Sequence, residues 1–267
     1  MPRSLGFVFF FTIVLLLVGS VHYWIWARLV RDLALPPGWQ RALGALVVLL
    51  GLSVPLTFYL SRALDPGSAR PLLLVLFAWL GIMFWLVVLL GGAELIRVAA
   101  WIWERTRGQV EPAFAAERRT LLARALGGAV VLVAGGFTAF GARSALGRVQ
   151  VKRVEIPLKR LPRALDGFSI VQLSDVHVGP TIGRDFIEEI VATCNALEAD
   201  VVAITGDLVD GPVSKLSDAV APLAELRSRQ GAFFVTGNHE YYSGAEAWCR
   251  HLSELGLRVL RNEHVTL

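Results

Sequence analysis

Long and short runs of apolar residues divide this chain into two parts. In the first part, four stretches contain no Asp, Glu, Lys or Arg over approximately the length that a helix needs to cross a bilayer, about 20 residues. They are Ser4–Ala27, Ala42–Ser61, Pro71–Ala93 and Ala125–Ala142. We therefore expect a four-span transmembrane region in residues 1–142. The fourth stretch is the shortest and is rich in Gly and Ala, so a buried helix or a signal-like anchor is its alternative interpretation.

The second part, residues 143–267, has a different pattern. Short apolar runs alternate with amphipathic segments, which is typical of parallel strands joined by helices in an α/β fold. The expected strands are Val149–Leu158, Phe168–Leu173, Asp200–Thr205, Ala232–Thr236 and Leu257–Leu260. The expected helices are Asp185–Leu197, Leu216–Leu226 (interrupted by Pro222) and Ala245–Leu255.

Composition supports this division. Of the 267 residues, 55% are hydrophobic, and the mean hydropathy is +0.57, which is too apolar for one soluble domain. The net charge of +4 comes from the first part, because residues 1–142 hold 12 Lys and Arg against 6 Asp and Glu. From residue 143 onward there are 14 basic and 16 acidic residues, so no nucleic-acid partner is indicated.

Charged residues around the spans predict an orientation. The loops after the first and third spans hold 9 Lys and Arg, against 7 on the opposite side. The positive-inside rule then places those loops in the cytoplasm and the C-terminal domain outside it. Arg118-Arg119 before a Gly/Ala-rich run resembles a twin-arginine signal, with an ordinary basic flank as the alternative. His22 and Glu94 lie near span ends, and we interpret both as interfacial residues.

The two cysteines carry little information. Cys194 falls on the apolar face of a predicted helix, and Cys249 lies beside Trp248 in another. Buried cysteines commonly act as small hydrophobic residues, and a disulfide here has no support beyond the even count.

Polar groups follow three of the predicted strands. Asp175 and His177 come just after the strand Phe168–Leu173, and Asp207 and Asp210 come after Asp200–Thr205. Gly237-Asn238-His239-Glu240 comes after Ala232–Thr236. Taken singly, each group is explained as well by a turn, a surface imidazole or a helix cap. Together they would meet at the carboxyl edge of a parallel sheet, where such sheets bind ligands. The set therefore predicts a metal centre.

The motifs resemble those of a known superfamily. Asp175-x-His177, Gly206-Asp207-x-x-Asp210 and Gly237-Asn238-His239-Glu240, in this order, are similar to the calcineurin-like metallophosphoesterases. The resemblance extends from Val151 to the C-terminus and is strongest to membrane-attached bacterial YkuE/YaeI-type phosphoesterases. It implies an N-terminal multi-span α-helical membrane region followed by an α/β metallophosphoesterase-type domain. Residues 1–142 are then the membrane region and 143–267 the N-terminal part of that domain.

The resemblance also implies a set of metal ligands. Asp175 and His177 would hold one ion, Asp207 would bridge two ions, and Asn238 would bind the second. A carboxylate has two oxygens, and two bridged ions lie about 3.5–4 Å apart. Carboxylate and imidazole ligands without thiolates suit two divalent ions of Mn, Fe or Zn. Such ions lower the pKa of a shared water, which attacks phosphorus in line.

Two further residues receive catalytic roles from the resemblance. His239 would remain free of metal, stabilise the phosphoryl oxygens and protonate the leaving group. Asp210 would pair with His239 and set its tautomer and charge. The alternative for His239 is a structural histidine at the start of a helix. Glu240 follows the family pattern, but the sequence assigns it no role.

One departure from the family pattern concerns later histidines. The family completes its site with further histidines, including a Gly-His-x-His element, whereas only His251 and His264 follow here, in other contexts. We therefore expect a domain that is incomplete at its C-terminus, with too few ligands for the second ion and an unpaired sheet edge. We expect activity from the full-length parent, and whether the chain as given is active or inactive stays open.

The leading hypothesis is a membrane-anchored phosphoesterase in a bacterial cytoplasmic membrane. Its partners would be the membrane and a phosphomono- or diester, with lipid or lipid-linked compounds as candidate substrates. The alternative is a membrane sensor or scaffold that keeps a degenerate phosphoesterase fold. Transport through the four spans is the weakest hypothesis, because no span carries a central charge. The oligomeric state, the substrate and the identity of the metal stay open.

Overall fold

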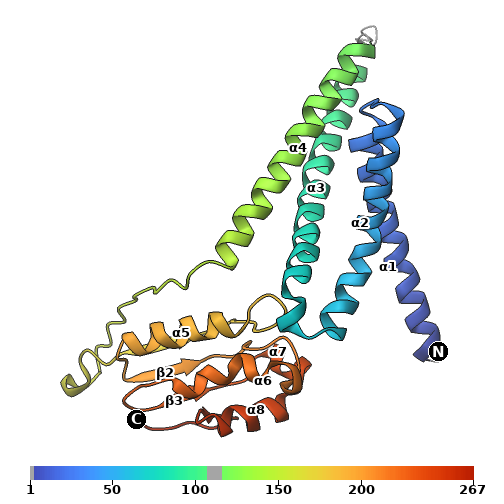
Figure 1. The fold of residues 1–267 in the computed structure, drawn as a ribbon. Coiled ribbons are helices and arrows are strands. Elements are labelled where there is room, and N and C mark those ends of the chain that lie inside the picture. The colour runs from blue at the N-terminus through green and yellow to red at the C-terminus, as the bar shows by residue number, and fades with distance from the viewer. Residues whose placement is uncertain (1–2, 107–115) are drawn as a thin grey trace. The chain divides into compact units, whose positions relative to one another are not determined.

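A computed structural model describes residues 3–106 and 116–267 (Figure 1). The chain divides into two units. One comprises Met1–Ala63 and Leu72–Ala145, and the other comprises Leu64–Pro71 and Leu146–Leu267. The first unit is entirely helical, whereas the second holds a parallel sheet with its connecting helices.

Four long helices make up the first unit. They are α1 (Arg3–Trp26), α2 (Pro37–Ala63), α3 (Pro66–Thr106) and α4 (Ala116–Ala145), and α1 continues into a π-helical turn, η1 (Ala27–Arg31). The segments long and apolar enough to cross a membrane are Val8–Arg31, Pro37–Ala63, Gly67–Trp103 and Thr120–Ala145. Each overlaps one predicted span, so the expected architecture, a multi-span helical region before an α/β domain, is confirmed. The side chains of Arg118 and Arg119, the twin-arginine candidates, lie outside the described residues.

The helices of the first unit bury little of their apolar surface. A small core joins α1, α3 and α4 through Ile25, Leu86, Leu90, Val130 and Ala134. Elsewhere, large apolar side chains face outward along every helix. A water-soluble bundle would bury such side chains, whereas a bilayer solvates them, so the surface chemistry agrees with an integral membrane region.

His22, which the sequence predicts near a span end, has a buried side chain. Its side chain lies between α1 and α2, where a Cβ on Gly51 would come within 3.2 Å of its ring. Its residue exposure is only 5%, and Nδ1 lies 2.8 Å from the carbonyl oxygen of Val18.

The second unit is built on four parallel strands. In spatial order these are β1 (Ile170–Leu173), β2 (Val201–Ile204), β3 (Ala232–Phe234) and β4 (Arg258–Val259). The connections contain α5 (Arg184–Ala196), α6 (Val213–Val220), η3 (Ala221–Glu225), α7 (Asn238–Ser243) and α8 (Ala245–Glu254), and a short turn, η2 (Arg163–Leu165), precedes β1. Because β1, β2 and β3 are parallel and adjacent, their carboxyl ends lie at the same edge of the sheet.

Periodic apolar positions explain how the helices pack in this unit. Ile187, Ile190, Val191 and Cys194 recur at helical spacing on α5, and all are buried. They share one core with the strands and with residues of α6, η3 and α8 (Figure 1). Crossovers between adjacent parallel strands are almost always right-handed, which brings successive helices to the same face when the strand order is sequential.

Two expected elements differ in the structure. Val149–Leu158 is not a strand, and Val151, Val154, Ile156 and Leu158 are all exposed. Alternating apolar and polar residues make this segment compatible with a sheet. A strand also requires a hydrogen-bonded neighbouring strand, and the described residues supply none. The helix expected at Leu216–Leu226 ends at Val220 and continues as the 3-10 turn η3, because Pro222 lacks the N–H that an α-helix needs.

A substitution of the largest side chain in the core of the second unit, that of Trp248, would test the packing described above. Trp248 is fully buried, and its Nε1 donates to the carbonyl oxygen of Gly211 at 2.9 Å. We predict that Trp248→Ala lowers the free energy of unfolding by about 3–5 kcal/mol, through lost burial and a cavity. Denaturant unfolding followed by circular dichroism measures the change. Tyr242→Ala, at a residue that is 79% exposed, is the control and should change stability little.

The two cysteines provide a second prediction. Both are free and buried, and burial raises the pKa of the Cys194 thiol to about 11. Burial likewise raises the pKa of the Cys249 thiol. Because the thiolate is the reactive form, both should resist alkylation by iodoacetamide at pH 8 in the native protein and react in denaturant. Rapid native labelling, detected by mass spectrometry, would contradict the packing of α5 and α8.

Candidate metal centre

The backbone pairing of β1 with β2 continues past the ends of both strands. The amide of Asp175 donates to Gly206 O at 3.2 Å, and the amide of His177 donates to Asp207 O at 3.0 Å. One residue further on, Val178 N lies 2.8 Å from Leu208 O. The loops that carry the first two motifs are therefore held side by side as an extension of the sheet.

Three motif residues adopt a left-handed backbone that is unusual for residues other than Gly. The φ angles are +56° at Asp175, +54° at His177 and +51° at Asp207. Such a conformation costs on the order of 1 kcal/mol or more per residue and concentrates at functional sites. Here it occurs at three residues of the first two motifs.

Glu240 joins the second and third motifs from inside the protein. It is fully buried, and its carboxylate accepts hydrogen bonds from four backbone amides. The donors are Asp207 N (3.0 Å), Leu208 N (2.8 Å), Val209 N (3.3 Å) and Gly237 N (2.6 Å). A buried carboxylate is tolerated only with such compensation, and the four bonds fix the loop after β2 against the start of α7.

Sequence reasoning missed this role for Glu240. A signal for it existed, because Gly237-x-x-Glu240 has the spacing at which a Glu in the first turn bonds back to the N-cap amide. That rule accounts for the bond to Gly237 N. It gives no hint of the three bonds to the loop after β2, which depend on the tertiary structure.

Two glycines allow the loops to approach closely. A Cβ on Gly206 would overlap the backbone of Gly237, and a Cβ on Gly237 would overlap the carboxylate and backbone of Asp207. Gly206 also has φ of +89°. Glycine is therefore required at both positions, and the missing side chains bring the amide of His239 within 3.0 Å of Asp207 Oδ1.

Three motif side chains converge in front of this edge. His177, Asp207 and His239 each offer one potential ligand atom, and these atoms lie within 4.8 Å of one another. Asp210 contacts both imidazoles, with its Oδ1 at 3.0 Å from His177 Nδ1 and 2.6 Å from His239 Nδ1. The two rings meet edge to face, with centroids 4.4 Å apart.

The carboxylates change the proton affinity of His177. Burial by itself lowers the pKa of its imidazole, but the hydrogen bond to Asp210 and the charges of Asp210, Asp207 and Asp175 raise it. The net result is a pKa above the ordinary value for histidine. A site that favours a protonated imidazole is one with surplus negative charge, and such a site also attracts a cation.

The two remaining predicted ligands have exposed side chains. Asp175 Oδ2 accepts a hydrogen bond from Ser174 Oγ at 2.5 Å, and its charge is among those that act on His177. Asn238 is the first residue of α7, between Gly237 and His239. The geometric cluster therefore contains two of the predicted ligands, His177 and Asp207, together with His239, for which the family resemblance implies a metal-free role.

The donor set fits divalent metal ions. A carboxylate and imidazoles converge, and both imidazoles direct Nδ1 to the same carboxylate oxygen. A carboxylate accepts hydrogen bonds, so each Nδ1 is the protonated nitrogen and Nε2 stays free to bind. A carboxylate that holds a histidine in this way is the usual outer partner of a metal ligand. Mn, Fe and Zn are the metals suited to such ligands.

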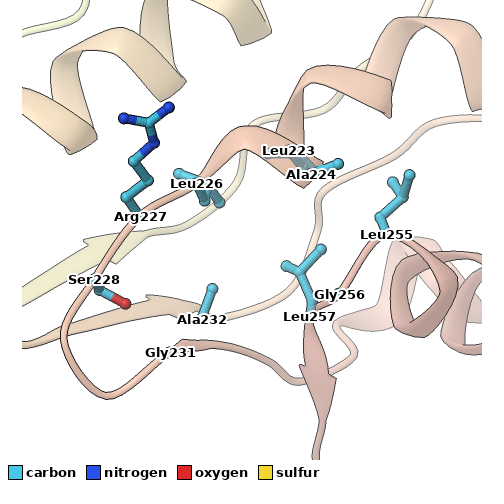
Figure 2. Close-up of a pocket in the computed structure, with 10 residues that line it drawn as sticks. All are labelled: Leu223, Ala224, Leu226, Arg227, Ser228, Gly231, Ala232, Leu255, Gly256 and Leu257. Atoms are coloured by element: carbon cyan, nitrogen blue, oxygen red, sulfur yellow. The ribbon is translucent and has the colours of Figure 1, made fainter.

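A separate pocket lies away from this cluster. Its volume is about 360 Å³, and its lining includes Leu226, Arg227 and Leu257 (Figure 2). It also contacts Ala232, the first residue of β3, whereas the motif residues follow the last residues of the strands. The pocket is thus at the opposite edge of the sheet and takes no part in the centre.

The buried carboxylate gives a testable prediction. We expect Glu240→Ala to lower the free energy of unfolding by at least about 3 kcal/mol, because it leaves four amides without their acceptor. Glu240→Gln keeps the volume but presents an NH₂ group to backbone donors, so it should also destabilise. Thermal unfolding followed by circular dichroism measures both. Glu254→Gln, at an exposed side chain of α8, should leave stability nearly unchanged.

Comparisons with known proteins agree with this geometry. Residues 168–265 match the model of the calcineurin-like phosphoesterase family. The chain is 34% identical over 256 residues to a transmembrane protein with metallophosphoesterase domain from Danio rerio, covering 94% of this chain and 56% of that protein. The protein of the same name from Bos taurus is 35% identical over 266 residues, covering 95% of this chain and 57% of its own length.

The similarity to a bacterial relative is shorter. The uncharacterized metallophosphoesterase YkuE of Bacillus subtilis is 29% identical over 144 residues, which cover 51% of this chain and 50% of YkuE. No solved structure matches the chain significantly. The chain thus spans little more than half the length of the vertebrate proteins, and its similarity to them includes the helical region. Residues 168–265, with their three motifs at one sheet edge, belong to the calcineurin-like metallophosphoesterase family.

Proposed function

We propose that this chain is a membrane-anchored, metal-dependent phosphoesterase that hydrolyses phosphomono- or diesters. The observation that carries the proposal is the convergence of His177, Asp207 and His239, with Asp210 bonded to both imidazoles. The family match supports the reaction class. The four apolar helices support membrane attachment.

In this proposal, Asp175 and His177 would hold one divalent ion, Asp207 would be shared with a second, and Asn238 would contribute to the second. The ions would activate a water for attack on phosphorus and offset the charge of the phosphoryl oxygens. The amide of His239 donates to Asp207 Oδ1 at 3.0 Å and so orients this carboxylate. Glu240 holds the same loop in place through the backbone.

His239 acts as the general acid in this scheme. Its Nδ1 donates to Asp210, so Nε2 remains to contact a phosphoryl oxygen or the leaving oxygen. The hydrogen bond to Asp210 keeps the ring of His239 oriented. In the structure Asp210 also bonds His177, so one carboxylate positions both a ligand and the acid.

Attachment to a membrane favours a lipid or lipid-linked phosphoester as the substrate. A span-anchored site encounters such substrates by diffusion in two dimensions. We place the domain on the extracytoplasmic side, because the Lys and Arg surplus assigns the loops after the first and third spans to the cytoplasm.

The proposal predicts manganese-dependent hydrolysis of an aryl phosphodiester. Asp207→Asn should reduce kcat at least about 100-fold, because it removes one charge and the bridging geometry. Manganese binding by the purified chain, measured by electron paramagnetic resonance, should weaken in parallel. Asp218→Asn removes the same charge from an exposed position on α6 and should change neither property.

The outcomes separate enzyme from non-enzyme. Metal-dependent turnover that survives Asp207→Asn would exclude this centre as the active site. Manganese bound through Asp207 without turnover of phosphomono- or diesters would instead support the degenerate sensor or scaffold.

A further inference from the structure

A network of ion pairs lies among the helices of the first unit, outside the metal centre. Arg28 of η1 directs Nη1 to Asp32 Oδ2 at 2.8 Å and Nε to Glu94 Oε1 at 2.8 Å. Glu94 also receives Arg97 Nη1 at 2.9 Å. The network thus ties the end of the first span to α3. It also explains Glu94, which the sequence places near a span end without a partner.

The network contains more positive than negative charge. Arg31 Nε also lies 3.0 Å from Asp32 Oδ1. Arg124 of α4 donates to the backbone oxygens of Leu33 and Ala34 at 2.9 and 3.0 Å, which are neutral acceptors. Three guanidinium groups therefore contact the two carboxylates, and a fourth bonds the backbone just after Asp32, so these six side chains carry a net charge of about +2.

Part of this network lines a cleft between helices. Its wall contains the charged side chains of Arg28, Asp32 and Arg97, and the remaining lining is apolar, with Leu29, Leu90 and Leu126 among its residues. The cleft is small, with a volume of about 20 Å³. We refer to it as the arginine cleft.

The charged residues of the arginine cleft lie near the ends of candidate spans. The first candidate span ends at Arg31, the third ends at Trp103, and the fourth begins at Thr120. Arg28, Asp32 and Arg97 are within six residues of these ends, where lipid headgroups meet the apolar core. Exposed Trp101 and Trp103 near the end of the same helix α3 are typical of this interface.

We propose that the arginines of this network, beside the arginine cleft, bind the phosphate of an anionic phospholipid. Guanidinium groups pair well with phosphate oxygens, and basic clefts between spans are suited to anionic headgroups. The side chains of Arg97 and Arg31 are 47% and 49% exposed, so they are accessible to a headgroup. Leu95, Ile96 and Val98 flank Arg97 on α3 and are exposed, so they can contact acyl chains, which a free phosphate lacks. This site is independent of the proposed hydrolysis.

The test measures lipid binding by the purified chain in a neutral detergent. Native mass spectrometry counts bound phosphatidylglycerol, phosphatidylcholine or glycerol phosphate, and thermal unfolding reports stabilisation. We expect phosphatidylglycerol to bind and to raise the Tm, with much weaker effects from the other two. Arg97→Gln should weaken binding of phosphatidylglycerol about fivefold to tenfold, the effect of one guanidinium near a membrane surface or in a charged hydrogen bond.

Two further variants keep the test decisive. Arg105→Gln removes the same charge from the same helix, outside the cleft, and should retain binding. Arg28→Lys keeps the charge but loses the planar fork, so it should fold and bind the lipid more weakly. Equal binding of phosphatidylglycerol and phosphatidylcholine, or equal losses in Arg97→Gln and Arg105→Gln, would overturn the proposal. Equal stabilisation by glycerol phosphate would overturn the lipid as its ligand.

Discussion

The metal centre depends on one buried carboxylate. The carboxylate of Glu240 is compensated by hydrogen bonds from four backbone amides. Three of these amides belong to consecutive residues after β2, and the fourth begins the turn into α7. An acceptor at this point satisfies donors that would otherwise be buried without partners. It also fixes the spacing between the second and third motifs.

Fixed loops explain how short motifs produce a site. Asp207 and His239 come from loops on different strands, yet the His239 amide bonds the Asp207 carboxylate directly. The two glycines make this approach sterically allowed, and the left-handed residues are held by backbone bonds to neighbouring loops. The strain at the site is thus offset by hydrogen bonds within the extended sheet.

The two units of the chain solve different solvation problems. In the α/β unit, apolar side chains are buried in one core, and charge gathers at the edge of the sheet. In the helical unit, apolar side chains face outward, and polar groups such as His22 and Glu94 are enclosed or paired. Exposure of an apolar side chain is therefore favourable in the helical unit and unfavourable in the α/β unit, because lipid solvates apolar groups and water solvates polar ones.

Local sequence patterns determined much of this protein. Apolar runs gave the four spans, short strands gave the parallel sheet, and motif positions after strands predicted that their side chains meet at one edge. These features are local, because hydropathy and turn chemistry act over a few residues. The sequence also suggested Asp210 as the partner of His239, through a family resemblance and not through spacing.

Only the tertiary structure decided the remaining features. It showed that Asp210 bonds His177 as well as His239, that Glu240 anchors the loop after β2, and that His22 is enclosed by α2. It also left Val149–Leu158 without a partner strand, despite its alternating pattern. Each of these depends on residues far apart in the chain. A pattern of a few residues shows which side chain needs a hydrogen-bond or packing partner, but only the fold determines which residue is close enough to be that partner.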